Sequence, residues 1–230
     1  MAERVLFIAP HPDDEILGCG GTIAKFATAA HEVHVAYLTS GEHGSRDAPA
    51  AELGVLRERE ARAAMSVLGV DHEHLTFLRI GDGQISPYDR GQADAVIRLL
   101  RQVRPALLYL PHAEDGSFDH QAAHAVVLRA ADMAGSQNFP GLGPAHWVPA
   151  LLGYEVWSPI ARPAYLEDIG QFTSAKLAAL GCYSSQAGKG FVQVAHIGPG
   201  GLALSAFRGA VTTGGHREAF SVLRIGQVIS

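Results

Sequence analysis

The chain alternates short apolar runs with stretches of helical apolar spacing, and this alternation restricts its fold more than any other feature. The apolar runs cover residues 5–9, 33–38, 75–78, 106–110 and 151–157. The helical stretches cover residues 15–30, 52–68, 92–103, 120–134 and 173–180. Short buried strands that alternate with helices are typical of a parallel sheet with helices on both faces. The sequence therefore predicts an α/β fold.

The pattern changes in the C-terminal part of the chain. After Gly188 the segments become short and strand-like, at residues 191–197, 202–207 and 219–225. The region 135–149 is rich in glycine and proline and is predicted to be a loop. We therefore expect a single domain over residues 1–230. It would have a Rossmann-like, mostly parallel sheet flanked by helices, and a β-rich C-terminal part.

The composition narrows the class of partner. Of 230 residues, 47 % are hydrophobic and 18 % charged, which suits a globular domain with a sizeable core. The formal net charge of −5 offers no basic surface for a nucleic acid. No apolar run approaches the length of a membrane span, and the first is too short for a signal peptide. Two cysteines, Cys19 and Cys182, make no disulfide framework, so we expect a reducing cytoplasm.

The most informative motif is the segment His11-Pro12-Asp13-Asp14-Glu15. It directly follows the apolar run 5–9 and leads into the helical stretch that follows it. Open parallel sheets bind their ligands at such strand–helix turns. Imidazole and carboxylate groups can hold a divalent metal, and an adjacent carboxylate can move a proton. The motif therefore predicts a metal site with an acid–base group beside it.

A second polar cluster follows the strand predicted at 106–110 and contains His112, Asp115, Asp119, His120 and His124. Because the carboxyl ends of parallel strands meet at one edge of the sheet, we expect the two clusters to converge. His11, Asp14 and His120 would then give a metal two nitrogens and one oxygen, with a position left open for water. Asp13 adjoins a ligand and could accept a proton from that water. For His124 a surface position is the commoner outcome.

A plainer interpretation competes with metal binding. Asp13 or Asp14 can be the N-cap of the helix that follows, and Glu15 suits the positive end of a helix. Asp119 can cap the helix predicted at 120–134 in the same way. Capping does not explain His11, however, and the sequence places an acid–histidine cluster at each of two predicted strand–helix junctions.

At these residues the chain resembles the LmbE/PIG-L family of metal-dependent N-deacetylases. The first motif of that family is present as Pro10 and the five residues that follow it, and then as Gly18-Cys19-Gly20-Gly21. Weaker matches are Gly41-Glu42, Arg57 to Glu60, Leu68-Gly69, Tyr154-Glu155-Val156-Trp157, Lys176 to Gln186 and Arg217-Glu218-Ala219-Phe220. The first motif is specific, and the others are jointly strong because they run over nearly the whole chain.

The resemblance implies a role for each matching residue. His11, Asp14 and His120 match the zinc ligands of the family, with one Zn²⁺ per chain, although Fe²⁺ or Mn²⁺ suits similar ligands. Asp13 matches the general base. Arg57 matches a substrate-contacting arginine, the alternative being an exposed helix charge. The implied activity is hydrolysis of an N-acetyl or other N-acyl group from an amino sugar or a related small molecule. Assembly into a homo-oligomer is left open.

The chain departs from the family at one important position. Where the family usually has H-P-D-H, this sequence has Ser117-Phe118-Asp119-His120, so that the third ligand and the acid before it are kept but the first histidine is not. The resemblance implies that the absent histidine steadies the oxyanion and protonates the leaving amine, whereas a serine hydroxyl is a poor acid near neutrality. Either the metal alone carries the oxyanion, or a neighbouring histidine substitutes, the candidates being His112, His43 and His216.

Two other functions are open at this point. Ser117 is compatible with a non-catalytic or altered sugar- or metabolite-binding member of the same fold, which acetate release would distinguish from an enzyme. A nucleotide-binding α/β protein is the second alternative. It has little support, because Gly18, Gly20 and Gly21 fall inside a predicted helix and lack the G-x-G-x-x-G spacing.

Overall fold

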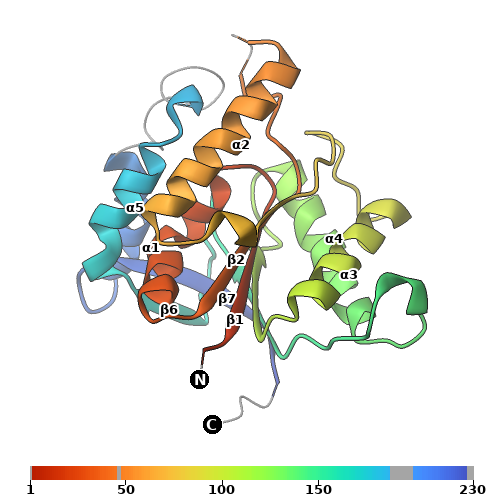
Figure 1. The fold of residues 1–230 in the computed structure, drawn as a ribbon. Helices are drawn as coiled ribbons and strands as arrows, with labels where there is room; N and C mark the ends of the chain where they lie inside the picture. The colour runs from red at the N-terminus through yellow and green to blue at the C-terminus, as the bar shows by residue number, and fades with distance from the viewer. Residues whose placement is uncertain (1, 46–47, 187–198, 227–230) are drawn as a thin grey trace.

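The computed structural model describes residues 2–45, 48–186 and 199–226. In this part of the chain, seven strands form one sheet in the order β3-β2-β1-β4-β5-β7-β6 (Figure 1). The strands are β1 Arg4–Ala9, β2 Glu32–Tyr37, β3 Leu75–Phe77, β4 Leu107–Pro111, β5 Ala150–Tyr154, β6 Tyr165–Asp168 and β7 Arg217–Ile225. The first five strands pair in parallel, whereas β7 runs antiparallel to both β5 and β6. The predicted mostly parallel sheet is therefore confirmed.

Helices cover both faces of this sheet, as the alternating pattern predicts. They are α1 Asp14–Thr28, α2 Ala50–Val67, α3 Arg90–Val103, α4 Phe118–Ala134, α5 Thr173–Leu180 and α6 Ala203–Ala210. In Figure 1, α1, α2 and α5 lie on the left of the sheet, and α3 and α4 lie on the right. No helix of the described ranges combines the length and the apolar character that a membrane span requires.

Alternate residues of each strand serve two separate cores. In β1, Val5 and Phe7 pack with the helices α1, α2 and α5 on one face. Leu6 and Ile8 point the other way and pack with α3 and α4. Because successive side chains of a strand face opposite sides, a strand that is buried on both faces must be apolar throughout. This requirement explains why the strand predicted at 5–9 is one unbroken apolar run.

The segment 202–207 was predicted to be a strand, and this prediction is wrong, because α6 covers it from Ala203 onward. Leucine and alanine are strong helix formers, and their alternation here imitates a strand pattern only briefly. The helix is held by Arg208, which donates to both carboxylate oxygens of Glu155 at 3.0 and 2.7 Å. Both partners of this ion pair are buried. The strand predicted at 191–197 lies outside the described residues.

The short edge strand β6 was not predicted from the sequence. Its four residues are Tyr-Leu-Glu-Asp, and only Glu167 among them is buried. The Glu167 carboxylate accepts hydrogen bonds from Lys25 of α1 and from Tyr165 of its own strand. An edge strand whose buried residue is an ion-paired carboxylate carries no alternating apolar signal, so the hydrophobic pattern could not reveal it.

The glycines at the start of α1 allow this helix to approach the sheet closely. A Cβ atom built on Gly18 would lie 2.4 Å from Cδ2 of Tyr154 and 2.8 Å from the carbonyl oxygen of Glu155. Both contacts are shorter than a real Cβ tolerates, and one of them is to backbone. The position therefore requires glycine, because any side chain would push the first turns of α1 away from the end of β5.

The Gly18→Ala variant should lower the free energy of unfolding by about 1–3 kcal/mol, the usual cost of overpacking. The matched control is Gly141→Ala, since a Cβ at Gly141 meets no atom within 4 Å. Urea unfolding midpoints of both variants and of the unmodified protein provide the measurement. If the two variants unfold at the same urea concentration, the close approach of α1 does not matter for stability.

Candidate metal centre and active site

The residues of the predicted site converge at the carboxyl ends of β1 and β4. His11 and Asp14 lie between β1 and the first turn of α1, and His120 lies in the first turn of α4, which follows β4. His11 and Asp14 border a cavity of about 580 Å³, and His120 lies buried behind Asp14. Its lining residues are His11, Asp13, Asp14, Leu17, His43, Gly44, Arg57, Asp82, Gly83, Ser117, Phe118, Asp119, Trp157 and Gln186. The parallel topology thus brings together two segments that are more than a hundred residues apart in the sequence.

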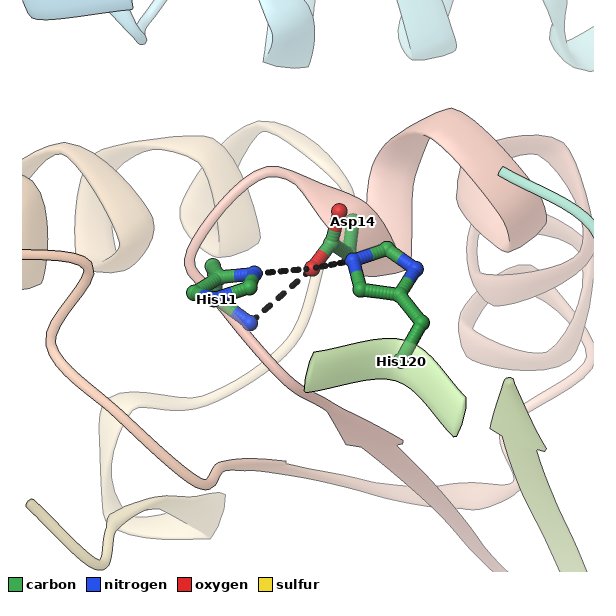
Figure 2. A group of neighbouring side chains, drawn as sticks. All are labelled: His11, Asp14 and His120. Atoms are coloured by element: carbon green, nitrogen blue, oxygen red, sulfur yellow. Dashed lines mark hydrogen bonds and ion pairs between the residues drawn. The ribbon is translucent and has the colours of Figure 1, made fainter. Parts of the chain in front are cut away.

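Asp14 lies at the centre of this group, with an imidazole on either side of its carboxylate (Figure 2). Its Oδ2 atom is 3.0 Å from Nδ1 of His11 and 3.1 Å from Nε2 of His120. The same oxygen accepts a hydrogen bond from the backbone N–H of His11 at 2.9 Å. The turn between β1 and α1 is therefore closed by the side chain that also faces both histidines.

The three side chains fit a divalent metal. One ligand atom from each residue lies within 4.8 Å of the others. Ligands of a tetrahedral Zn²⁺ are ~3.3 Å apart when the bonds are about 2.0–2.1 Å long, close to the contacts around Asp14. His120 is completely buried, yet neither of its ring nitrogens makes a hydrogen bond of acceptable geometry among the described residues. A buried imidazole without a hydrogen bond is costly unless another partner, such as a metal, completes it.

Carboxylates stand behind both imidazoles. Nε2 of His11 is 3.2 Å from Oδ2 of Asp119 and 3.2 Å from Oδ1 of Asp82. Nδ1 of His120 is 3.2 Å from Oδ1 of Asp115. Histidines that bind metals commonly direct their second nitrogen to a carboxylate, which fixes the orientation of the ring. This arrangement gives Asp119 a contact that its expected role as a helix cap does not explain.

Asp82 was not predicted to belong to the site, and Asp115 was expected in the second polar cluster without a role of its own. Asp82 lies after β3 in the turn Gly81-Asp82-Gly83, a glycine-flanked sequence that is typical of a turn. The signal was present, because a polar residue after any strand of a parallel sheet lies at the same edge. Asp115 is buried, and besides His120 it accepts hydrogen bonds from the backbone of Ser117 and Trp157.

The buried charges strongly perturb one another. Burial favours the protonated form of Asp14, but the imidazoles of His120 and His11 outweigh this and hold its pKa far below the ordinary range. Burial alone would lower the pKa of His120, yet the carboxylates of Asp14 and Asp115 raise it to about 9. The carboxylates that favour the protonated form of an imidazole would also attract a divalent cation.

Asp13 has an unusual backbone and an unusual side-chain environment. Its φ of 114° lies in the left-handed region, and although it occupies the N-cap position of α1, its side chain makes no capping hydrogen bond. Instead, Oδ1 of Asp13 is 3.1 Å from the guanidinium of Arg57. Burial raises the pKa of Asp13 to about 7, and the charge of Arg57 partly opposes the rise. The predicted N-cap position of Asp13 is therefore correct, but the predicted capping by its side chain is wrong.

Arg57 is not the exposed helix charge of the alternative interpretation, because only 3 % of it is exposed. Its guanidinium donates to the carbonyl oxygens of Gly41 and Pro12, in addition to its ion pair with Asp13. Gly41, with a φ of 62°, leaves the space for this arrangement, because a Cβ there would lie 2.3 Å from the guanidinium. Arg57 thus connects α2 to the turn that carries Asp13.

Glu15 was expected to interact with the positive end of α1, but it is completely buried. Its carboxylate accepts hydrogen bonds from the hydroxyls of Tyr37 and Tyr183 and from the backbone N–H of Asp13. Burial raises the pKa of Glu15 to about 8, although the hydrogen bond from Tyr183 opposes the rise. The residue forms a polar support beneath the turn and does not line the cavity.

The histidines proposed to replace the family residue at Ser117 occupy very different places. His112 is buried outside the cavity, its Nε2 donating to the carbonyl oxygen of Ser158 and its Nδ1 accepting from Glu114. His216 contacts Ser205 and also lies outside the cavity. His43 and Ser117 both line it. The expectation of a surface position for His124 is wrong, since its Nδ1 donates to the carbonyl oxygen of Pro111 in the interior.

The fold and the site together define a class of protein. It is an α/β protein in which two imidazoles and a carboxylate form a candidate metal centre at the carboxyl edge of a mostly parallel sheet. The model of the PIG-L family, GlcNAc-PI de-N-acetylase, matches residues 6–131 of the sequence. This match includes β1, α1, β4 and the first turn of α4, which are the elements that carry the candidate metal ligands. The chain belongs to this family.

Relatives with printed activities are similar over most of the chain. Diacetylchitobiose deacetylase of Thermococcus kodakarensis is 32 % identical over 195 residues, which cover 80 % of this chain and 70 % of that protein. The 1D-myo-inositol 2-acetamido-2-deoxy-alpha-D-glucopyranoside deacetylase of Rhodococcus opacus is 33 % identical, covering 73 % of this chain and 66 % of its own length. The solved N,N'-diacetylchitobiose deacetylase of Pyrococcus horikoshii superposes with a TM-score of 0.83 at 26 % identity, covering 96 % of this chain and 84 % of that one.

The environment of Glu15 predicts a pH dependence of stability. Because the pKa of Glu15 is about 8 in the folded protein, above its value in the unfolded chain, the folded state binds more protons between these two values. The free energy of unfolding should therefore fall as the pH rises from about 5 to about 8, by up to about 1.4 kcal/mol per pH unit from this group.

Thermal unfolding of the metal-free Glu15→Gln variant should show a weaker decline over the same pH range. The difference between the two curves isolates Glu15 from the other groups that titrate in the site. Glu52→Gln, at an exposed position in α2, is the control and should follow the unmodified protein. Parallel curves for Glu15→Gln and the unmodified protein would show that Glu15 is ionised in the folded state.

Proposed function

We propose that the protein is a metal-dependent N-deacetylase that removes an N-acetyl group from an amino sugar or a related small molecule. The observation that carries this proposal is the convergence of His11, Asp14 and His120 at the edge of one cavity, which His11, Asp14 and the neighbouring Asp13 line. The names of the relatives support the same activity, since two of them act on acetylated amino sugars. These relatives give no support to the non-catalytic alternative.

We assign one Zn²⁺ per chain to His11, Asp14 and His120. When bound, this ion would acidify a water molecule and polarise the acyl carbonyl. The donor set of two imidazoles and one carboxylate leaves a coordination position open, as catalytic zinc sites require. Asp119 and Asp82 on one side, and Asp115 on the other, would hold the two imidazoles in position through their second nitrogens.

Asp13 is the residue that we assign as general base. It lines the cavity and adjoins the ligand Asp14, but its own carboxylate is directed to Arg57 and not to either histidine. Arg57 fixes the position of this carboxylate by an ion pair while it lines the cavity itself, where it can contact the substrate. The base takes a proton from water as the hydroxyl adds to the acyl carbon.

The leaving amine needs a proton, and we assign its donor to His43. Among the histidines suggested as substitutes, His43 is the one that lines the cavity. Its backbone N–H donates to Oδ2 of Asp82, and its ring Nδ1 lies 3.2 Å from the carbonyl oxygen of the same residue. A carbonyl oxygen accepts only, so Nδ1 carries a hydrogen, and in the imidazolium form Nε2 carries the second hydrogen, which it can give to the leaving nitrogen. The C–N bond breaks as the nitrogen takes the proton.

The cavity can accommodate a sugar, because it combines polar and apolar walls. Carboxylates and imidazoles line its floor, and Leu17, Phe118 and Trp157 supply apolar surface. Phe118 is 88 % exposed, at the position where the family pattern usually has proline.

As for the compartment, we propose the cytoplasm. This assignment is supported by the free thiols of Cys19 and Cys182.

The variant Asp13→Asn should lose most of the activity while it keeps the zinc. A general base contributes typically 10²–10⁴-fold, so we expect kcat to fall by about that factor. The assay is acetate release from N-acetylglucosamine and N,N'-diacetylchitobiose, with the zinc content measured on the same sample. Asp94→Asn, an ion-paired helix residue outside the cavity, is the matched control. Undiminished turnover by Asp13→Asn would remove Asp13 from the mechanism.

The variant His43→Gln should lower kcat by about 10²-fold with a smaller effect on KM, since it removes an acid that acts on the leaving group. Adding Ser117→His to this variant restores the family residue and should recover part of the lost rate. Both are measured by acetate release over a range of pH. A kcat of His43→Gln equal to that of the unmodified protein would mean that no histidine replaces the family residue.

A further inference from the structure

A second group of metal-ligand side chains lies at the opposite end of the sheet. Glu32 and His34 lie at the start of β2 and, being two residues apart in one strand, point to the same side of the sheet. His74 ends the 3-10 helix that leads into β3 and directly precedes Leu75, which pairs with Val35 of β2. The candidate active site lies at the other, carboxyl ends of these parallel strands.

The three side chains are already in mutual contact. Oε1 of Glu32 is 2.8 Å from Nε2 of His34, and the rings of His34 and His74 have centroids 4.3 Å apart. One ligand atom from each of the three lies within 4.8 Å of the others. Across the described part of the chain, the ring nitrogens of His74 make no hydrogen bond. The ring of His74 therefore packs against a second imidazole with its own lone pair unused.

The charges around the group suit a cation. An imidazole binds a metal through an unprotonated ring nitrogen, and a carboxylate binds it as an anion. Glu32 supplies the carboxylate, which Arg4 and His34 both contact. Arg4 is the opposing charge, but its Nε contacts Oε2 of Glu32 at 3.3 Å, so Oε1 is left on the side of the histidines.

We propose that Glu32, His34 and His74 form a second metal site that takes Zn²⁺ or a similar transition-metal ion. Two imidazoles and one carboxylate are ligands that such ions prefer, and water would occupy the fourth position. The ion would connect β2 to the start of β3. This strand has only three residues, all of them half-buried, and it forms the edge of the sheet. A metal link would keep it from fraying.

The test is the number of zinc ions bound by the full chain. The protein is stripped with a chelator and dialysed against free Zn²⁺, and zinc is then measured per chain. We expect two ions in the unmodified protein and one in His74→Ala. The second ion should raise the thermal unfolding temperature of the unmodified protein but not that of His74→Ala. Because the site is remote from the cavity, acetate release at saturating zinc should be the same in both.

His72→Ala is the matched control, since His72 lies in the same short helix but contacts Ser66 and the carbonyl oxygen of Arg62 instead. It should bind two ions. A single ion in the unmodified protein would overturn the proposal. So would two ions in His74→Ala, because the second ion would then lie elsewhere.

Discussion

The carboxylate of Asp14 is the point on which the rest of the site depends. It closes the turn after β1 by accepting the backbone N–H of His11, and it faces an imidazole from each half of the site. The half-buried His11 and the buried His120 would repel each other if both were protonated, and the anion between them offsets this repulsion. The parallel pairing of β1 with β4 delivers His120 to this carboxylate. Topology and electrostatics thus specify the same geometry.

The C-terminal part of the chain supports this centre without lining it. The buried carboxylate of Glu218 in β7 accepts hydrogen bonds from the backbone of Gly21 and Thr22 in α1. The same carboxylate pairs with Lys176 of α5, which also donates to the carbonyl oxygen of Leu17. Removing one partner of such a buried pair would leave an uncompensated charge. The antiparallel strand β7 and the helix α5 therefore hold α1 at the depth that Asp14 requires.

The sequence predicts those parts of the molecule in which pattern and burial agree. The continuous apolar run of β1 and the motif after it indicate a strand, a turn and a metal site, and the structure brings His11, Asp14 and His120 together as expected. Prediction fails where tertiary ion pairs decide the structure, as in α6, which Arg208 anchors, and in β6, whose buried residue is a carboxylate. Asp82 was missed because its place in a Gly-Asp-Gly turn is already explained by the local turn conformation. Its contact with His11 depends on the order of the strands alone.

The left-handed backbone of Asp13 has a consequence for how this protein can change. A residue other than glycine costs about 1–3 kcal/mol in such a conformation. Glycine would relax the backbone there, so the chain would gain stability at the expense of the carboxylate. Selection for stability alone would therefore favour glycine, which could not act as the proposed base. The backbone conformation at Asp13 thus favours glycine, whereas the proposed reaction requires the carboxylate at the same position.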